Sequence, residues 1–481
     1  MLKKLLKNSF FYSISTFLSK GIGVILLPFY TRVLTPSDYG IMDLVAVSVL
    51  MVTNAFSLQT NQSMCRYYVD DKSVEDQKSY FSTTMIFYII IYSVIAFIVY
   101  TFRSSFALFL FGSASYSSVL TLAALNILIN NVYYLTSTLY RLKSESKQFS
   151  LLSFIRTIAS SLLIILFVLF LKMGVIGVFW GQIAANTLML LIVLGKLIGN
   201  FDIKLFSRTK LFEMIRFGFP LVPTVLIIFI MQYVDRIMIT KMIGIEALGL
   251  YAVGIKVSSL ISLLLSGFQL AWGPYVFGNY QKEDTKRIIS IFFHYINIFS
   301  LLIVSFLLLF SSDLLKILAD PSFYNAYKVV PLLSVSTLFF ALGSYFSIGF
   351  GIANKNGIQS IIYLFVIIIN ISLNYMLIKK NGITGAALAT MISFILSGIS
   401  SIIISNRFYP IEYNLKKLAL YLIYFALNVT IYVLFLNNEL TLKELAIKFS
   451  LMFIWVLLIF RIEKIDPKKL KNKLDKSLGK M

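Results

Sequence analysis

The sequence is poor in the residue types on which soluble enzymes and secreted domains depend. It contains one cysteine, Cys65, and one histidine, His294. A single cysteine excludes an intrachain disulfide and a cysteine-rich metal site. A single histidine leaves almost nothing for a histidine metal site or a serine–histidine catalytic pair. Charged residues make up 13% of the 481 residues, about half the share in a typical soluble domain.

Motifs of nucleotide and metal enzymes are also missing. The chain has no Gly-x-x-x-x-Gly-Lys-[Ser/Thr] phosphate-binding loop, which speaks against ATP hydrolysis within it. The acidic stretch 70–76 resembles a metal site by composition, but we interpret it as a solvated loop. No long loop is available on the predicted outer side to hold catalytic groups. We therefore predict a protein that is not an enzyme, with no catalytic residues, no cofactor and no metal site.

Hydrophobic residues, by contrast, dominate the chain. They make up 58% of it, and the mean hydropathy is +0.85. Since a membrane helix needs roughly 20 apolar residues, these values predict an all-α polytopic membrane protein with about 14 transmembrane helices. The predicted helices are 10–28, 41–59, 80–101, 118–139, 150–171, 174–195, 217–235, 249–272, 288–310, 328–350, 359–378, 383–405, 418–436 and 444–460. The first ends in Leu-Pro-Phe-Tyr-Thr-Arg32 instead of a signal-peptide cleavage site, so we expect it to be retained.

The net charge of +22 is distributed unevenly between the two sides of this predicted topology. With the N-terminus inside, 29 Lys and Arg residues fall on the cytoplasmic side and 10 on the opposite side. The positive-inside rule therefore places both termini in the cytoplasm. The basic tail 462–481 could suggest nucleic acid, but we interpret it as juxtamembrane charge that contacts anionic lipid. We expect no nucleic-acid partner.

Two joints between helices recur at nearly the same offset. The run Lys172-Met-Gly174-Val-Ile-Gly177 is matched 208 residues later by Lys380-Asn-Gly382-Ile-Thr-Gly385, and the joint at Arg32 is matched 204 residues later at Arg236. This pattern predicts two six-helix lobes related as parallel repeats, with a midplane cavity between them. The predicted divisions are the N-terminal lobe 1–205, the C-terminal lobe 206–410, two extra helices in 411–461 and the tail 462–481.

Three basic residues lie inside predicted spans. Lys20 is about ten residues into the first helix, roughly 15 Å deep. Lys256 is about as deep in the eighth helix, and Arg156 is about two turns into the fifth. Snorkelling towards the interface is the alternative, and it suits Arg156 better than the two lysines. We predict that all three line the cavity and bind an anionic substrate, for which a pyrophosphate-bearing lipid fits.

Four further charged residues lie near the outer ends of helices, namely Arg32, Asp43, Asp235 and Arg236. We predict a gate or an ion pair here, and we favour pairing of the aspartates with the nearby arginines over substrate contact. For His294 we favour a hydrogen-bonded helix histidine over a proton-coupling residue.

Three motifs carry a family resemblance: Phe29-Tyr-Thr-Arg-Val-Leu-Thr-Pro-Ser-Asp-Tyr-Gly40, Phe217-Gly-Phe-Pro-Leu221 with Asp235-Arg236 and Gly249-Leu-Tyr251, and Asn370-Ile-Ser-Leu-Asn374 with Gly382-Ile-Thr-Gly385-Ala-Ala. Together they resemble the signatures of bacterial polysaccharide-biosynthesis flippases, the Wzx-like family. That family shares a superfamily with multidrug and toxin extruders and peptidoglycan-precursor flippases.

The resemblance implies a function in O-antigen or capsule synthesis. It implies two six-helix bundles around a V-shaped, alternating-access cavity, with two further helices beside them. The implied substrate is an undecaprenyl-pyrophosphate-linked oligosaccharide, moved across the bacterial inner membrane and bound by lumenal cations, for which Lys20, Arg156 and Lys256 are the candidates. Membrane lipid, a polysaccharide polymerase and glycosyltransferases are the implied partners.

Two other functions remain open at this point. A cation-coupled multidrug or small-solute antiporter would have the same fold, but it predicts acidic cavity residues, whereas the midplane charges here are basic. A membrane polysaccharide polymerase or ligase is the enzyme alternative, and it lacks the outer loops that such chemistry needs.

Overall fold

A computed structural model describes residues 21–70, 73–143, 145–435 and 441–463. These residues form helices joined by short connections, and no strand occurs among them. Twelve of the described helices are long and apolar enough to cross a membrane. Large apolar side chains such as Phe97, Phe170 and Phe365 are mostly exposed, as expected of surfaces that face lipid. The prediction of an all-α polytopic membrane protein is confirmed.

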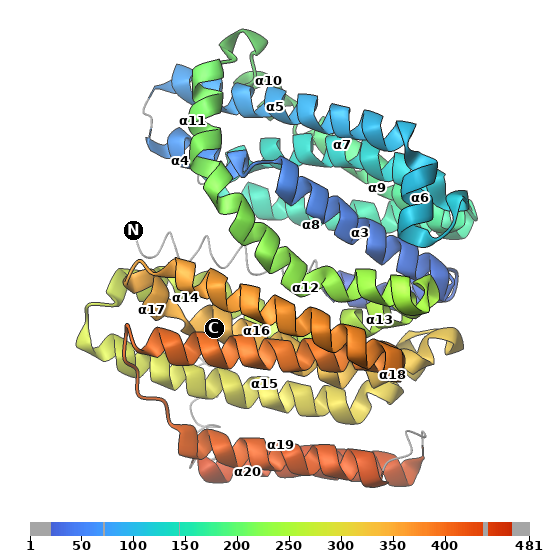
Figure 1. The fold of residues 1–481 in the computed structure, drawn as a ribbon, viewed down its shortest axis with the longest axis vertical. Helices are drawn as coiled ribbons and strands as arrows, with labels where there is room; N and C mark the ends of the chain where they lie inside the picture. Colours follow the sequence, from blue (N-terminus) through green and yellow to red (C-terminus); the bar gives the residue numbers. More distant parts are fainter. Residues whose placement is uncertain (1–20, 71–72, 144, 436–440, 464–481) are drawn as a thin grey trace, which may run out of the picture.

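The N-terminal half forms one group of helices, in the upper part of Figure 1. Thr35 starts its first long helix with a capping box, in which its hydroxyl accepts from the backbone of Asp38 and the Asp38 carboxylate accepts in return. The elements are α2 (Leu27–Thr31), α3 (Pro36–Phe56), α4 (Thr60–Asp70), α5 (Val74–Thr101), α6 (Arg103–Phe111), η1 (Ala114–Tyr116), α7 (Ser117–Leu142), α8 (Ser146–Ile165), η2 (Leu166–Phe170), α9 (Gly174–Ile192), α10 (Leu194–Asn200), η3 (Ile203–Leu205) and α11 (Arg208–Gly218).

The C-terminal half forms a second group below the first, and the last two helices lie side by side at its lower edge (Figure 1). Pro220 and Pro223 fall in the first turns of η4 and α12, where a missing backbone N–H is tolerated. The elements are η4 (Phe219–Leu221), α12 (Val222–Ile243), α13 (Ile245–Ser258), α14 (Leu260–Asn279), α15 (Glu283–Leu318), η5 (Pro321–Lys328), α16 (Val330–Phe346), α17 (Ile348–Ile352), α18 (Asn356–Asn406), α19 (Leu415–Phe435) and α20 (Leu442–Ile462).

Both predicted joints, at Lys172–Gly177 and at Lys380–Gly385, interrupt the helical backbone. Lys172 and Gly174 have φ angles of 52° and 56°, and Gly382 has a φ of 57° inside α18. The Asn370 amide donates to the Ser393 hydroxyl at 3.2 Å, although 23 residues of straight helix would separate them by roughly 34 Å. The chain therefore doubles back at Gly382, and α18 counts as two spans. The described segment Gly21–Thr31 is the end of the first predicted helix.

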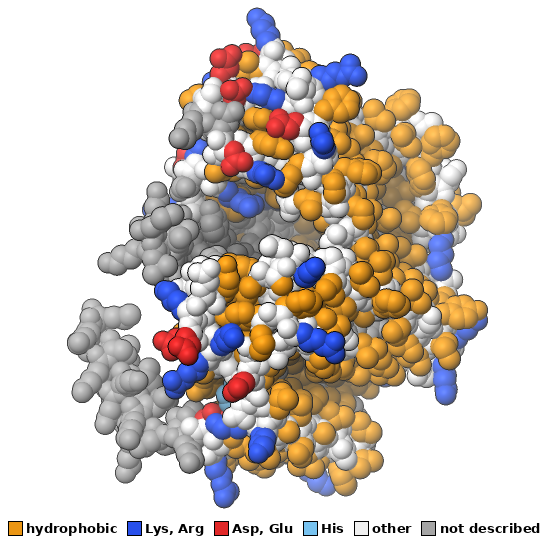
Figure 2. Space-filling view, turned by 60° about the vertical axis from the view of Figure 1, so that its left-hand side comes forward, with side chains coloured by type: hydrophobic (Ala, Val, Ile, Leu, Met, Phe, Trp, Pro, Cys, Tyr) orange, Lys and Arg blue, Asp and Glu red, His pale blue; other side chains and the backbone are white. Residues whose placement is uncertain are grey.

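The helix ends gather at two faces of the molecule, which we call the basic end and the opposite end. At the basic end lie the described parts of the connections 57–80, 139–147, 196–219, 280–290, 353–356 and 406–417, and several of them are joined by hydrogen bonds or ion pairs. Ser63 donates to the Met214 carbonyl at 2.8 Å and the Lys196 ammonium lies 2.7 Å from the Glu145 carboxylate. Figure 2 shows charged side chains gathered on this side, beside a surface covered by hydrophobic side chains. The helix ends on the far side of the molecule from these connections form the opposite end.

At the opposite end, the two groups of helices approach until their backbones touch. A Cβ added to Gly40 on α3 would lie 2.1 Å from the Ile245 carbonyl oxygen, and one added to Gly249 on α13 would lie 1.8 Å from the Pro36 carbonyl oxygen. Only glycine permits such contact. The α3–α13 crossing therefore closes the space between the groups at this end.

The last helix is attached to α15 along its length. The Lys448 ammonium is fully buried and lies 2.7 Å from the Asp313 carboxylate, and Trp455 donates to Ser305 at 2.8 Å. At the basic end His294 is 2.8 Å from the Glu463 carboxylate, so it is a hydrogen-bonded helix histidine, as predicted. Burial alone would raise the pKa of Glu463, but hydrogen bonds, the largest from Lys417, outweigh it and hold that pKa below its usual range.

Candidate functional site

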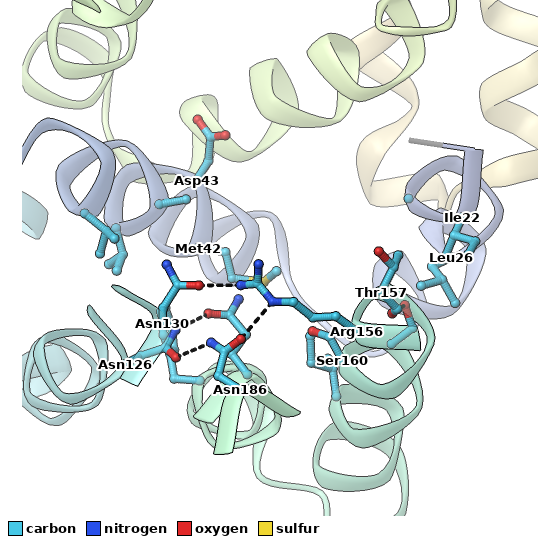
Figure 3. Close-up of a pocket in the computed structure, with 18 of the residues that line it drawn as sticks. Ile22, Leu26, Met42, Asp43, Asn126, Asn130, Arg156, Thr157, Ser160 and Asn186 are labelled. Carbon is cyan, nitrogen blue, oxygen red and sulfur yellow. Dashed lines mark hydrogen bonds between the residues drawn. The ribbon is translucent and has the colours of Figure 1, made fainter. Parts of the chain in front are cut away.

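A cavity of about 1000 Å³ lies between the N-terminal group and α13 (Figure 3). Its walls come from α2, α3, α7, α8 and α9 on one side and from α13 and α14 on the other. The lining residues extend from Tyr30 and Tyr39, near the closed opposite end, to Phe149 and Ser262, towards the basic end. This volume is at the upper end of the usual range for ligand pockets, so it can hold a ligand of several sugar rings.

Arg156 lies on α8 and faces this cavity. Its Nε donates to the Asn186 carbonyl oxygen at 2.9 Å, and its Nη2 donates to the Asn130 carbonyl oxygen. The guanidinium also lies over the Tyr133 ring, 5.1 Å from its centroid. Among the described residues no carboxylate forms an ion pair with it. Arg156 is therefore held in place by neutral groups, and no described carboxylate is paired with it (Figure 3).

The hydrogen bonds continue from Arg156 through further amides. Asn186 donates to Asn126 at 2.7 Å, and Asn126 donates to Gln182 at 3.0 Å. Asn126 and Asn130 are four residues apart on α7, as are Gln182 and Asn186 on α9, so each pair shares one helix face. These four residues were not among those predicted from the sequence. Two pairs of amides at helical spacing in otherwise apolar spans were the signal that could have found them.

Lys256 lines the same cavity from α13, in the other group of helices. A Cβ added to Gly23 would lie 2.8 Å from its Nζ, which places the ammonium against the end of the first helix. No ion pair of Lys256 occurs within the described part of the chain. The structure thus brings Arg156 and Lys256 to one cavity, whereas Lys20 lies outside the described residues.

The predicted ion pairs form around Arg236 and join the two groups of helices. Arg236 on α12 is 3.0 Å from the carboxylate of Asp43 on α3 and 3.1 Å from that of Asp235. Asp235 also accepts from the Tyr251 hydroxyl at 2.6 Å and from Thr390 at 3.3 Å. Arg236 and Asp235 are 7% and 4% exposed, so this network is largely removed from water.

Arg32 does not take part in that network. It is exposed, and its charge adds to hydrogen bonds from Ser322 in lowering the pKa of Asp320. Pairing of an aspartate with the nearby arginine therefore occurs at Arg236, whereas no ion pair of Arg32 with Asp43 occurs among the described residues.

The cavity has an excess of available positive charge. Asp43 is the one carboxylate among the described residues that line it, and that carboxylate is bound to Arg236. Arg156 and Lys256 have no such partner among the described residues. No group of three or more His, Cys, Asp or Glu side chains suited to a metal occurs in that part of the chain either. The arrangement is suited to binding an anion.

Comparisons with known proteins agree with this fold. The structure is similar to that of the lipid II flippase MurJ in an inward closed conformation, with a TM-score of 0.74 and 15% identity over 94% of this chain and 99% of that one. It is also similar to an inward-facing multidrug resistance MATE family transporter of the MOP superfamily, with a TM-score of 0.66 and 16% identity over 82% of this chain and 94% of that one.

Sequence comparisons find relatives over most of the chain. An uncharacterized membrane protein of Methanocaldococcus jannaschii is 23% identical over 448 residues, which are 86% of each chain. The MatE family profile matches residues 220–376, and the profile described as "Polysaccharide biosynthesis protein" matches residues 5–279. Because this last match spans more than half of the 481 residues, the chain belongs to the polysaccharide biosynthesis protein family.

Proposed function

We propose that this protein is a flippase that moves an undecaprenyl-pyrophosphate-linked oligosaccharide repeat unit across the cytoplasmic membrane by alternating access, without ATP hydrolysis. The observation that carries the proposal is the cavity of about 1000 Å³ into which Arg156 and Lys256 face from the two groups of helices. A pyrophosphate group bound between them would receive charge-assisted hydrogen bonds from both groups. The family and the fold support a transporter that acts in polysaccharide synthesis.

A cation-coupled antiporter of drugs or small solutes is the second candidate. The MatE match at residues 220–376 and the presence of Asp43 in the cavity wall favour it. Against it, the Asp43 carboxylate is occupied by Arg236 at 3.0 Å, so that it offers an incoming organic cation less charge than a bare carboxylate would. The two candidates differ in the sign of the ligand charge, and a transport assay separates them.

The deciding experiment is transport by the purified protein in proteoliposomes. The substrate is the undecaprenyl-pyrophosphate-linked oligosaccharide extracted from cells that lack the protein. We expect translocation of this lipid, driven by a membrane potential and unaffected by ATP. An outward-moving anion gains about 2.3 kcal/mol per net charge per 100 mV of inside-negative potential. Full activity with neither a potential nor an ion gradient would contradict the coupling, and absence of translocation under all conditions would reject the flippase.

The proposed direction of transport requires that the basic end lies in the cytoplasm of a bacterial cell. Cysteine introduced between residues 238 and 247 should then react with a membrane-impermeant maleimide in intact cells. Cysteine between residues 464 and 480 should react only after permeabilisation, because the basic tail would be inside. The native Cys65 is first replaced by serine, which leaves a chain without other cysteines. The reverse labelling pattern would reject this orientation.

A further inference from the structure

The amide groups around Arg156 form a wall whose hydrogen-bonding polarity is fixed by the arginine. A guanidinium group has five N–H donors and no acceptor. Asn130 and Asn186 must therefore present their carbonyl oxygens to Arg156, as the structure shows. Each amide has one oxygen and one NH₂ group, so the orientation of the first amide determines that of the next.

The orientation of Asn186 fixes which group donates in each following hydrogen bond of the amide chain. Its oxygen is used by Arg156, so its NH₂ group donates to the Asn126 oxygen at 2.7 Å. The Asn126 NH₂ group in turn donates to the Gln182 oxygen at 3.0 Å. Along this path every amide oxygen accepts a bond from the wall itself. What is left over at the far end is the NH₂ group of Gln182.

The other amide bound to Arg156, that of Asn130, also leaves an NH₂ group without a partner in the wall. Asn130 uses its oxygen for Arg156, and its NH₂ group forms no hydrogen bond among the described residues, as is true of the NH₂ group of Gln182. Arg156 uses its Nε and one N–H of Nη2, so that its remaining N–H groups are also available. The residues of this wall all line the cavity. The groups without a partner in the wall are therefore donors, and they lie beside a positive charge.

We infer that this wall is a recognition subsite for an oxyanion on the translocated lipid, a phosphate or a sugar carboxylate, held by Arg156 and flanked by the NH₂ groups of Asn130 and Gln182. The inference rests on the proposed function and deepens it. Each amide oxygen of this wall already accepts one hydrogen bond, so the groups left without any partner are donors. Such a wall favours a ligand group that only accepts over a neutral sugar hydroxyl, which also needs a partner for its own proton. An oxyanion has only lone pairs to satisfy.

A near-isosteric substitution separates this role from a structural one. Asn130→Asp keeps the oxygen that binds Arg156, but its carboxylate neutralises the guanidinium and replaces the free NH₂ donor by an acceptor. The fold should tolerate the change, because the new pair is an ion pair with the same geometry. Asn130→Ala removes one hydrogen bond and leaves the charge, so its effect should be smaller. Gln281→Glu, which adds the same charge on the surface at the basic end, is the matched control.

The test is equilibrium binding to the purified full-length protein in detergent at low salt. The probes are inorganic pyrophosphate, trigalacturonate and the neutral trisaccharide maltotriose. We expect the wild-type protein to bind at least one of the two anions about tenfold more tightly than maltotriose. Asn130→Asp should lower the affinity for that anion by about tenfold or more, as expected for a lost charge-assisted contact. The tighter of the two anions identifies whether the lipid pyrophosphate or an acidic sugar is the source.

Two results would overturn the subsite. One is an unchanged anion affinity in Asn130→Asp at normal thermal stability, and the other is equal binding of maltotriose and both anions by the wild-type protein. These outcomes are distinct from failure of the flippase proposal. If the wild-type protein moves the lipid-linked oligosaccharide while Asn130→Asp still binds anions normally, the subsite is rejected and the flippase remains. If anion binding depends on Asn130 but no lipid is translocated, the flippase is rejected.

Discussion

Lys256→Ala and Lys256→Gln should abolish glycan export while the protein accumulates to normal levels. The ammonium of Lys256 lines the cavity, and no ion pair of it occurs within the described residues. Removal of a charge-assisted contact to the lipid pyrophosphate costs roughly 1.5–3 kcal/mol, which lowers binding by about ten- to a hundredfold. Lys256→Arg retains the charge with altered geometry, so we expect partial export. The measurement is export of surface glycan in cells whose only copy of the gene carries the variant.

The control is an exposed lysine at the opposite end, far from the cavity wall. Lys380→Ala removes the same charge from a solvent-exposed position and should leave export unchanged. The alternative in which Lys256 only snorkels predicts that an apolar replacement is neutral or stabilising. Lys20→Ala should behave like Lys256→Ala, and Arg156→Ala should show a milder defect. Normal export by the Lys20 and Lys256 alanine variants, singly and combined, would remove both lysines from the site.

The helices of this protein could be predicted from the sequence because the membrane imposes a simple rule. Each span must satisfy its own backbone hydrogen bonds and present about 20 apolar residues to lipid. The breaks at Gly174 and Gly382 were also predictable, because Lys next to Gly interrupts an apolar run in a way that permits a positive φ. Both properties depend on residues close together in the chain.

The site could be predicted only in part, because its contacts join distant residues. The depth of Arg156 and Lys256 within their spans pointed to a cavity, and both line one. The partners of Arg156 were not apparent, since they come from α7 and α9, 26 and 30 residues away. The pairing of Arg236 with Asp43 spans 193 residues. No local pattern encodes which helix faces meet in the fold.

Asp43→Asn should loosen the closed opposite end, whereas Asp235→Asn should not. Both aspartates contact Arg236 at nearly the same distance, 3.0 and 3.1 Å. Asp43, however, lies on α3 in the other group of helices, and Asp235 lies on α12 beside Arg236. Of these two ion pairs, only the one with Asp43 connects the two groups of helices, so its loss should shift the equilibrium towards opening by about tenfold or more.

The shift can be measured by the reactivity of a cysteine inside the cavity. A cysteine at Met42, which lines the cavity, is introduced into the Cys65→Ser chain and treated with an impermeant maleimide from the opposite end. Asp43→Asn should raise the labelling rate by about tenfold. Asp235→Asn should leave that rate unchanged and lower the thermal stability, because Tyr251 and Thr390 lose a charged acceptor.

Gly249→Ala gives an independent check on the same end of the molecule, because it separates the helices by volume instead of charge. Its Cβ would lie 1.8 Å from the Pro36 carbonyl oxygen, so α3 and α13 must move apart, whereas Gly195→Ala on α10 meets nothing within 4 Å and serves as control. We expect Gly249→Ala to reproduce the faster labelling of Asp43→Asn, and Gly195→Ala to match the parent. Equal labelling of Asp43→Asn, Gly249→Ala and the parent would show that this crossing is not what closes the cavity.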